Sequence, residues 1–366
     1  MKNTNRTLIG ITLGVVCIGL VVYFFNPRSK DPDLKLTTSL EQFIWSEMVN
    51  DNHTLKTTFQ ATSPAYSLSE SLGLAMEYAV LSNNQALFDH SYAQLEDYFL
   101  TNDNNVHWRV LANGKATEHV NAFLDDIRIV GALLDAGELW DSKKYLVTAE
   151  KITNTLTEQG TYEATFVDFY DWHHNEKSHD FSITYLDLET IRRVEELGWV
   201  SEQIRDNMEQ IAVKAAGEPG PLFPKNYNIE NEKFLYGDTV NMVEQVYAAY
   251  HLTRAGIATE NFHTFLKDVF IAENKLFGQY ETATVTPAVT YESPALYGIA
   301  ILYTLELDDE AFALDLYDRL KVFQRTEGPY QGAYFDESSQ DTHVFDNLFP
   351  LLAERSLQNS EIIQPE

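Results

Sequence analysis

A glutamate at the start of a helical pattern is the first residue in this chain that could transfer a proton. Glu70 lies in the segment Ser-Leu-Ser-Glu-Ser-Leu-Gly-Leu-Ala-Met at 67–76. One interpretation is a capping box, in which the side chains of Ser67 and Glu70 each accept a bond from the other residue's backbone amide. A helix N-terminus also favours the ionised form of a carboxyl. A general acid at this position therefore needs burial or nearby carboxylates that raise its pKa.

An acidic pair interrupts a strongly apolar helical pattern at 121–138. Asp126 comes four residues after Ala122, which places it on the apolar stripe and predicts that it faces inward. Asp125 is displaced by about 100° around the helix and is expected to pair with Arg128 or to face solvent. A buried salt bridge is the structural alternative for Asp126, since an unpaired buried carboxylate is costly.

Asp238 is the third candidate carboxylate. It precedes a helical pattern at 239–254, so an ordinary N-cap is the structural alternative. Glu70, the acidic pair and Asp238 all fall at the starts of predicted helices, and all could therefore face one end of a helical ring.

Carboxylates gathered in this way suit the hydrolysis of a glycosidic bond with inversion of configuration. One protonated carboxyl donates to the leaving oxygen, and a carboxylate roughly 6.5–9.5 Å away activates water. Sugar rings also stack on aromatic side chains, which have apolar faces and polar rims. Taken individually, each aromatic residue is better explained by packing in the core or in a loop. The candidates in or beside connecting segments are Trp108, Tyr170, Trp172, Tyr185, Tyr236 and Tyr330.

Motifs for other chemistries are absent from the sequence. There is no Gly-x-Gly-x-x-Gly, no Walker-type loop and no Gly-x-Ser-x-Gly, which disfavours nucleotide cofactors and the common serine hydrolases. His173, His174 and His179 share one polar stretch, but they lack the His-Glu-x-x-His spacing of a zinc site. We interpret this stretch as a solvated loop, and we expect neither a metal nor another cofactor.

Helical periodicity extends over almost the whole chain after residue 37, and the apolar positions recur at i, i+3 and i+4. The pattern predicts an all-α fold with twelve helices in pairs, which fits an (α/α)6 toroid of six helical hairpins; an open solenoid is the alternative, although no fixed repeat is visible. The predicted segments are 38–50, 69–82, 84–98, 121–138, 143–158, 184–196, 202–214, 239–254, 262–271, 292–305, 308–323 and 343–356.

An apolar run at 8–25 carries no charged residue and has the length of a minimal transmembrane helix. No small-x-small cleavage site follows it, so we predict a retained signal anchor rather than a cleaved signal peptide. The predicted organisation has a cytoplasmic tip at 1–7, a single transmembrane helix at 8–25, a linker at 26–36, a catalytic domain at 37–358 and a polar tail at 359–366. Flanking charges are nearly balanced, and we place the large domain outside the cell membrane.

The formal net charge of −29 repels phosphate backbones, so we expect no nucleic-acid partner. The single cysteine, Cys17, lies inside the apolar run. The rest of the chain therefore has neither a disulfide nor a catalytic thiolate.

Three segments of the sequence resemble glycoside hydrolase family 8. The segment Thr-Tyr-Leu-Asp at 184–187 is similar to the Ser-Tyr-Leu segment of that family. The segment 69–76 is similar to the Ser-Glu-Gly-x-x-Tyr-Gly-Met motif, whose glutamate is the general acid in that family. The segment 124–140 is similar to the Asp-x-Asp helix that ends in Ala-Gly-x-Leu-Trp, although Leu124 replaces the first aspartate. The likeness covers most of residues 40–355. The segments 123–128 and 344–348 resemble a membrane-anchored branch of the family found in Gram-positive exopolysaccharide clusters.

The resemblance implies an inverting hydrolase of a β-1,4-linked polysaccharide that is trimmed during its synthesis or release. Glu70 is then the general acid and Asp238 is the nearest match to the base, while Asp126, or Asp125 if the helix phase differs, positions the sugar. Exopolysaccharide synthase machinery is a possible partner. The alternative is an inactive polysaccharide-binding or scaffold protein on the same fold. The remaining predicted substrate contacts are Trp108, Trp172, Tyr185 and Tyr236.

Overall fold

The computed structural model describes residues 34–60, 64–335 and 341–364. Within these ranges a helix is found for each of the twelve predicted segments, so the helical class is confirmed. The helices are α2 (Ser39–Glu47), α3 (Ser69–Leu81), α4 (Gln85–Gln94), α5 (Phe123–Leu139), α6 (Lys143–Gln159), α7 (Leu188–Glu196), α8 (Glu202–Ala216), α9 (Met242–Arg254), α10 (Glu260–Glu273), α11 (Pro294–Glu306), α12 (Glu310–Leu320) and α13 (Phe345–Asn359).

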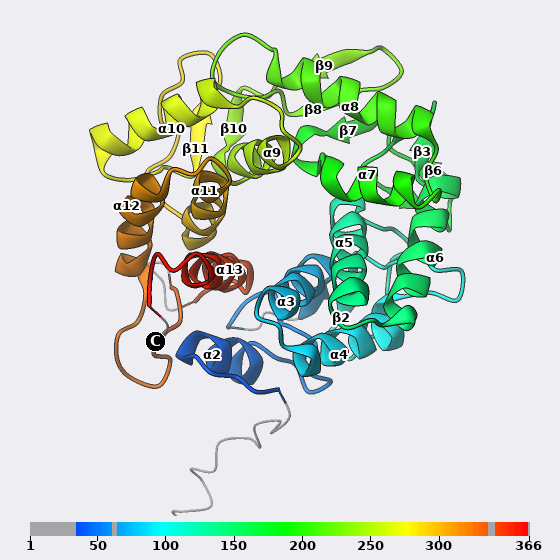
Figure 1. The fold of residues 1–366 in the computed structure, drawn as a ribbon, viewed down its shortest axis with the longest axis horizontal. Helices are drawn as coiled ribbons and strands as arrows, with labels where there is room; N and C mark the ends of the chain where they lie inside the picture. Colours follow the sequence, from blue (N-terminus) through cyan, green and yellow to red (C-terminus); the bar gives the residue numbers. More distant parts are fainter. Residues whose placement is uncertain (1–33, 61–63, 336–340, 365–366) are drawn as a thin grey trace, which may run out of the picture.

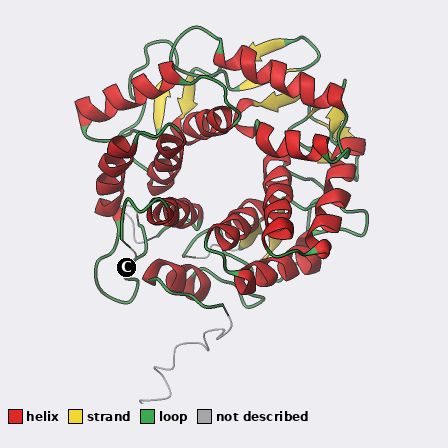
Figure 2. Ribbon diagram, viewed as in Figure 1, coloured by secondary structure: helices red, strands yellow, loops and turns green. Residues whose placement is uncertain are grey.

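The helices form two concentric rings (Figure 1). In the described residues the inner ring consists of α3, α5, α7, α9, α11 and α13, and each packs on the next, with α13 closing back onto α3. The remaining helices lie outside them (Figure 2). Short turns lead from the inner helices α3, α5, α7, α9 and α11 to the outer helices that follow them, such as residues 82–84 and 140–142. This is the arrangement of an (α/α)6 toroid.

Apolar side chains fix the inner helices. In α11 every residue from Pro294 to Thr304 is buried, as expected for a helix that is apolar on all sides. Gly298 lets α13 approach closely, because a Cβ at this position would lie 2.6 Å from the carbonyl carbon of Phe349. Local signals also set the helix starts, since the Asn84 and Asp309 side chains accept N-terminal amide bonds in α4 and α12.

Short antiparallel strands occupy several of the long connections. The pairs are β1 (Tyr66–Leu68) with β2 (Arg109–Leu111), β3 (Thr161–Tyr162) with β4 (Thr165–Phe166), β5 (Tyr170–Asp171) with β6 (Glu176–Lys177) and β10 (Thr239–Asn241) with β11 (Gln279–Glu281), while β7 (Asp180–Ser182), β8 (Asn226–Asn228) and β9 (Lys233–Leu235) form one sheet. Two predicted helix starts were therefore wrong. Residues 239–241 are strand, and α7 begins only at Leu188, after a 3₁₀ turn at Ile183–Tyr185.

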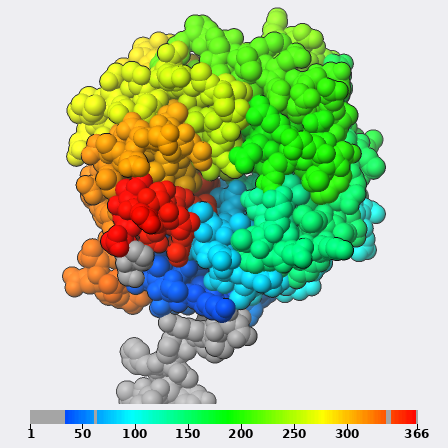
Figure 3. All heavy atoms as spheres, in the orientation of Figure 1, coloured from blue at the N-terminus to red at the C-terminus, as the bar shows by residue number. Residues whose placement is uncertain are grey.

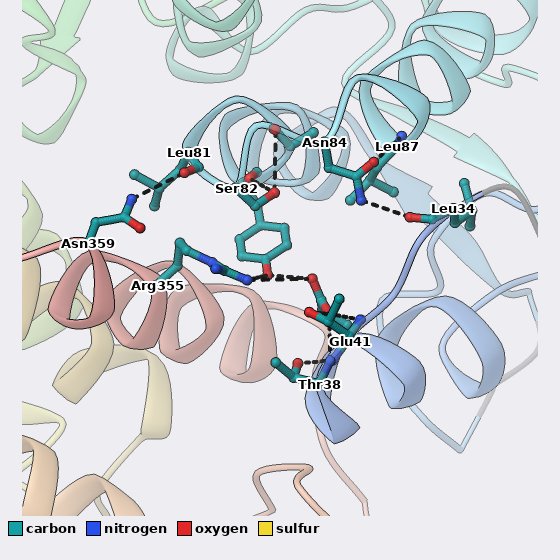
Figure 4. Close-up of polar contacts among 12 residues, drawn as sticks. Leu34, Thr38, Glu41, Leu81, Ser82, Asn84, Leu87, Arg355 and Asn359 are labelled. Atoms are coloured by element: carbon teal, nitrogen blue, oxygen red, sulfur yellow. Dashed lines mark hydrogen bonds and ion pairs between the residues drawn. The ribbon is translucent and has the colours of Figure 1, made fainter. Parts of the chain in front are cut away.

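A polar seam joins the first and last helices of the ring (Figure 4). Glu41 of α2 is 2 % exposed, and it accepts a 2.6 Å hydrogen bond from the hydroxyl of Tyr78 in α3. Arg355 of α13 donates to the same hydroxyl at 3.3 Å and lies 4.0 Å from Glu41. Thr38 and Glu41 also form a capping box at the start of α2. The space-filling view shows α2 and α13 side by side at this seam (Figure 3).

Both ends of the described chain lie at the same end of the ring. The Leu34 carbonyl accepts a 2.7 Å bond from Asn84, in the turn that follows α3. Asn359, the last residue of α13, donates to the carbonyl of Leu81 at the C-terminal end of α3. Glu70 is at the opposite, N-terminal end of α3.

None of the helices in the described ranges has the length and apolar character needed to span a bilayer. The predicted anchor at 8–25 and the tip at 1–7 lie outside those ranges. The described chain begins within the predicted linker, and α13 ends at Asn359, the first residue of the predicted tail.

Candidate active site

Glu70 lies in the first turn of α3, and the contacts of its neighbour Ser69 hold it there. We call this end of the inner ring, where α3 and α5 begin, its mouth. The Ser69 backbone amide and hydroxyl both donate to the carbonyl of Trp108, at 3.0 and 3.1 Å. The Ser69 hydroxyl also lies 2.6 Å from Oδ2 of Asp125. These bonds bring the first turn of α3 against the first turn of α5, so Glu70 and Asp125 share one site.

The predicted capping box at 67–70 was wrong. Ser67 belongs to β1, and its hydroxyl donates to Thr54 at 2.7 Å. The N-cap of α3 is Leu68, which makes no side-chain cap. The backbone pairing of β1 with β2 takes Ser67 away from the helix start, so the capping interpretation of Glu70 no longer applies.

The environment of Glu70 keeps a proton on its carboxyl near neutral pH. Burial is the main cause, the negative charge of Asp125 adds to it, and the positive charge of Arg128 opposes both; together they raise the pKa of Glu70 to about 7. A carboxyl that is protonated near pH 7 can donate to a leaving oxygen. This satisfies the requirement that the sequence placed on Glu70.

Asp125 holds the position beside Glu70 that the sequence argument gave to Asp126. Asp125 is 7 % exposed and accepts a 3.2 Å bond from Nη1 of Arg128, which is the predicted pairing. Asp126 is 1 % exposed and is bonded to Asn121 at 2.8 Å. Asp126 faces inward as predicted, but its side chain is buried in the protein interior beside Asn121. This burial raises the pKa of Asp126 well above the ordinary value.

Tyr185 is the predicted aromatic residue that the structure brings to Glu70. Burial raises the pKa of its half-buried hydroxyl, and the charges of Asp168, Asp125, Glu70 and Glu244 add to the effect. Its hydroxyl therefore lies within the electrostatic reach of these four carboxylates, where it can orient a sugar hydroxyl or a water molecule.

Asp168 belongs to the same group of carboxylates, although it was not among the site residues predicted from the sequence. Its two oxygens accept bonds from the backbone amide and the hydroxyl of Ser182, at 2.6 and 2.7 Å. Burial is the main cause that raises its pKa to about 6. Its carbonyl also accepts the amide of Phe123, the first residue of α5. Asp168 follows a two-residue strand, and no periodic pattern marks it.

Asp238 and Tyr236 lie in the exposed connection between β9 and β10, just before α9. Tyr236 is 48 % exposed, and its hydroxyl donates to Glu218 at 2.5 Å. The N-cap interpretation of Asp238 was wrong, because Asn241 caps α9. The charges that act on Glu70 are those of Asp125 and Arg128.

The two predicted tryptophans are connected to Ser69 through a series of backbone hydrogen bonds, in which the Trp108 carbonyl accepts from Ser69. Trp108 donates its backbone amide to Val120, and Trp172 donates its own to His119. The Trp108 indole donates to Glu118 at 2.9 Å, and the Trp172 ring centre is 5.1 Å from that of His107. Both side chains are half-buried, so each leaves part of its ring accessible.

The histidine-rich stretch is a hairpin at the surface. His173 and His174 are exposed, and His174 pairs with Asp171 at 2.8 Å. In the part of the chain that the structure describes, no three His, Cys, Asp or Glu side chains are grouped so that they could hold a metal ion.

Comparison with known proteins identifies relatives of the whole chain. The profile of glycosyl hydrolases family 8 matches residues 40–165. A Bacillus subtilis (strain 168) protein named putative lipoprotein YdaJ is 35 % identical over 370 residues, covering 98 % of this chain and 100 % of that protein.

Solved structures with the same fold include three bacterial proteins. A novel alpha-amylase from Clostridium perfringens is 26 % identical, with a TM-score of 0.80 over 90 % of this chain and 99 % of that one. PssZ from Listeria monocytogenes is 24 % identical, with a TM-score of 0.74 over 87 % and 95 %. Endoglucanase Cel10 from Klebsiella pneumoniae, a family 8 glycosyl hydrolase, is 15 % identical, with a TM-score of 0.63 over 88 % and 100 %.

Proposed function

This chain belongs to family 8 of the glycosyl hydrolases, and we propose that it hydrolyses a β-1,4-linked exopolysaccharide with inversion of configuration. Glu70 is the general acid in this proposal. The supporting observation is its pKa of about 7, which burial and the neighbouring Asp125 produce at the mouth of the inner ring. The protonated carboxyl donates to the glycosidic oxygen as the bond to the leaving sugar breaks.

The base activates a water molecule on the opposite face of the sugar. Asp238 is our proposed base, since it is exposed on a connection next to the N-terminal end of α9. Asp168 is the second candidate, because its charge and that of Glu70 act on the same Tyr185 hydroxyl. Asp125 is the proposed sugar-positioning carboxylate, because it shares Ser69 with the acid.

The first experiment measures reducing-end release from β-1,4-glucans, chitosans, xylan and native exopolysaccharide. Glu70→Gln should abolish release while leaving the fold intact, because a glutamine cannot give up a proton to the leaving oxygen. For the wild type, kcat/KM should fall above about pH 7, where the acid loses its proton. Full activity of Glu70→Gln, or a rate that keeps rising above that pH, would remove Glu70 from the acid role.

A second experiment separates the two base candidates. Asp238→Asn and Asp168→Asn are each assayed with and without azide, a small anion that can attack the sugar in place of activated water. The variant of the true base should lose most of its activity, regain part of it with azide and give a glycosyl azide of inverted configuration. Rescue of Asp168→Asn alone would move the base role from Asp238 to Asp168.

A second substrate class is α-1,4-glucan, because the Clostridium protein described as an alpha-amylase is 26 % identical over 90 % of this chain. Starch and glycogen therefore belong in the same assay. Release from them and not from β-1,4-linked polymers would change the proposed linkage. Binding of a polymer without cleavage would favour the scaffold alternative.

We also propose that the chain is held at the outer face of the cell membrane, where it trims the polymer during synthesis or release beside the synthase machinery. The apolar run at 8–25 supports this attachment, as does the name putative lipoprotein of the Bacillus relative. The chain could be attached by a single transmembrane helix or by a lipid on Cys17. The mass of the N-terminal peptide, measured on protein purified from membranes, distinguishes these two modes of attachment. An unprocessed peptide supports the single-pass anchor, and a lipid-modified Cys17 at a new N-terminus would replace it.

A further inference from the structure

The side chain of the buried Arg128 passes across helix α3, which carries Glu70, at the position of Gly73. A Cβ built on Gly73 would lie only 3.0 Å from Cδ and 3.3 Å from Cγ of Arg128. Glu70, Gly73 and Glu77 follow one another at i, i+3 and i+7, so they share one face of α3. The missing side chain at 73 therefore makes room for the Arg128 stem between the two glutamates.

The guanidinium of Arg128 is tied to three different helices. Nη1 donates to Asp125 on its own helix at 3.2 Å. Nη2 donates to the hydroxyl of Tyr247 in α9 at 2.8 Å. Nε donates to the same hydroxyl at 3.3 Å and forms an ion pair with Glu77 in α3, 3.7 Å from its Oε2. With Arg128 only 3 % exposed, these partners fix where its positive charge lies.

This charge works against a general acid at Glu70. A cation close to a carboxyl favours the ionised form, and the charge of Arg128 does act on Glu70 in this direction. Asp125 compensates for it from one side, and Glu77 binds the guanidinium from the other side of Gly73. Tyr247 anchors the guanidinium without contributing a charge, because its hydroxyl is neutral.

We propose that Glu77 is a positioning residue for the general acid. By pairing with Arg128 beyond Gly73, it holds the guanidinium on the side of the helix face away from Glu70 and offsets its charge, so that Glu70 keeps its proton. This role rests on the proposed function, and in it Glu77 acts on Glu70 through Arg128.

Other charged groups also act on Glu77. Arg128 and Asp135 come from α5, Arg254 from α9 and Asp187 from the N-cap of α7. Burial outweighs the two arginines and raises the pKa of Glu77 to about 7. Glu77 is therefore partly ionised at neutral pH, and its pairing with Arg128 strengthens as the pH rises.

The test follows the titration of the Glu70 carboxyl directly, in the full purified chain. Glutamate labelled with ¹³C at the side-chain carboxyl gives one NMR signal for each residue, and the signal lost in Glu70→Gln assigns Glu70. In Glu77→Gln the midpoint of this titration should fall by about half to one pH unit, because Arg128 loses one of its two carboxylate partners. The basic limb of kcat/KM should shift by the same amount.

Two further variants complete the experiment. Tyr247→Phe removes the uncharged anchor and keeps every carboxylate, and it should shift the midpoint in the same direction, which provides a test even where Glu77→Gln does not fold. Glu209→Gln breaks the 2.7 Å ion pair with Arg192 at the outer helix α8 and should leave the midpoint unchanged.

An unchanged Glu70 midpoint in Glu77→Gln, or in Tyr247→Phe where Glu77→Gln does not fold, overturns the positioning role, even for an active hydrolase. A shifted midpoint in a chain that cleaves none of the polymers supports the positioning role and counts against the proposed function instead. A shift of equal size in Glu209→Gln would show a general loss of structure and would also overturn the inference.

Discussion

Burial of Glu70 should make the folded protein less stable as the pH rises toward neutrality. Its pKa is about 7 in the fold, against an ordinary value of 4.5. Below pH 4.5 the folded and the unfolded chain both carry the proton. Between 4.5 and about 7 the unfolded chain loses the proton and the fold retains it, so the free energy of unfolding decreases through this window. Above about pH 7, the free energy of unfolding is lowered by the full amount that corresponds to the shift in the pKa of Glu70.

The size of this penalty follows from the shift in the pKa of Glu70. At 1.36 kcal/mol for each pKa unit, the rise corresponds to about 3 kcal/mol. Glu70 is half-buried rather than fully enclosed, and solvent screening reduces the expected value to about 1–2 kcal/mol. Glu70→Gln removes the ionisable group and keeps nearly the same shape, so it should recover this amount of stability at high pH only.

The assay is urea unfolding of the wild type and Glu70→Gln on both sides of the window, and it needs no substrate. The variant should gain about 1–2 kcal/mol relative to the wild type between the low and the high pH. Glu150→Gln, at an exposed position of α6, should show no such change. A difference between Glu70→Gln and the wild type that is the same at both pH values would refute the argument that burial raises the pKa of Glu70.

Three further substitutions test the seam, the helix packing and the charge beside the acid. Tyr78→Phe removes the donor to the buried Glu41 and should cost about 1–3 kcal/mol in urea unfolding; an unchanged midpoint would contradict the importance of the seam. Gly298→Ala places a Cβ 2.6 Å from the backbone of α13 and should lower the free energy of unfolding by about 1–3 kcal/mol or more, whereas a stability equal to the wild type would show that the two helices can separate freely. Asp125→Asn removes the negative charge that raises the pKa of Glu70, so the basic limb of kcat/KM should move down by about one pH unit; a limb that stays in place would leave burial as the only cause.

Helical periodicity predicted every helix of the described ring, but it could not determine the direction of the acidic pair. All eight residues from Phe123 to Val130 are buried. Because the helix is buried on all sides at this end of α5, the apolar positions do not indicate which side faces the site. Asp126 therefore appeared to face the site, while the contacts with Ser69 and Arg128 show that Asp125 does.

Long-range strand pairing explains the other failures. The Ser-x-x-Glu pattern at 67–70 is a good local signal for a capping box, but β2, about forty residues later in the chain, pairs with β1 and removes Ser67 from the helix start. The same pattern at Thr38 and Glu41 does form a capping box, since no strand competes there. Asp168 owes its place in the site to Ser182 on β7, a contact that no local pattern encodes.

The position of Leu34 beside the turn after α3 determines how far a tethered chain can reach. For a chain attached to a surface through the residues before Leu34, Glu70 lies at the far end of α3 from this attachment side, about 20 Å away along the 13 residues of the helix at 1.5 Å each. With the Glu70 end turned away from that surface, a polymer emerging from the same surface would reach Glu70 only after it has grown past the ring. The position of the attachment would then set a minimum polymer length for cleavage, so that only chains longer than this distance reach Glu70.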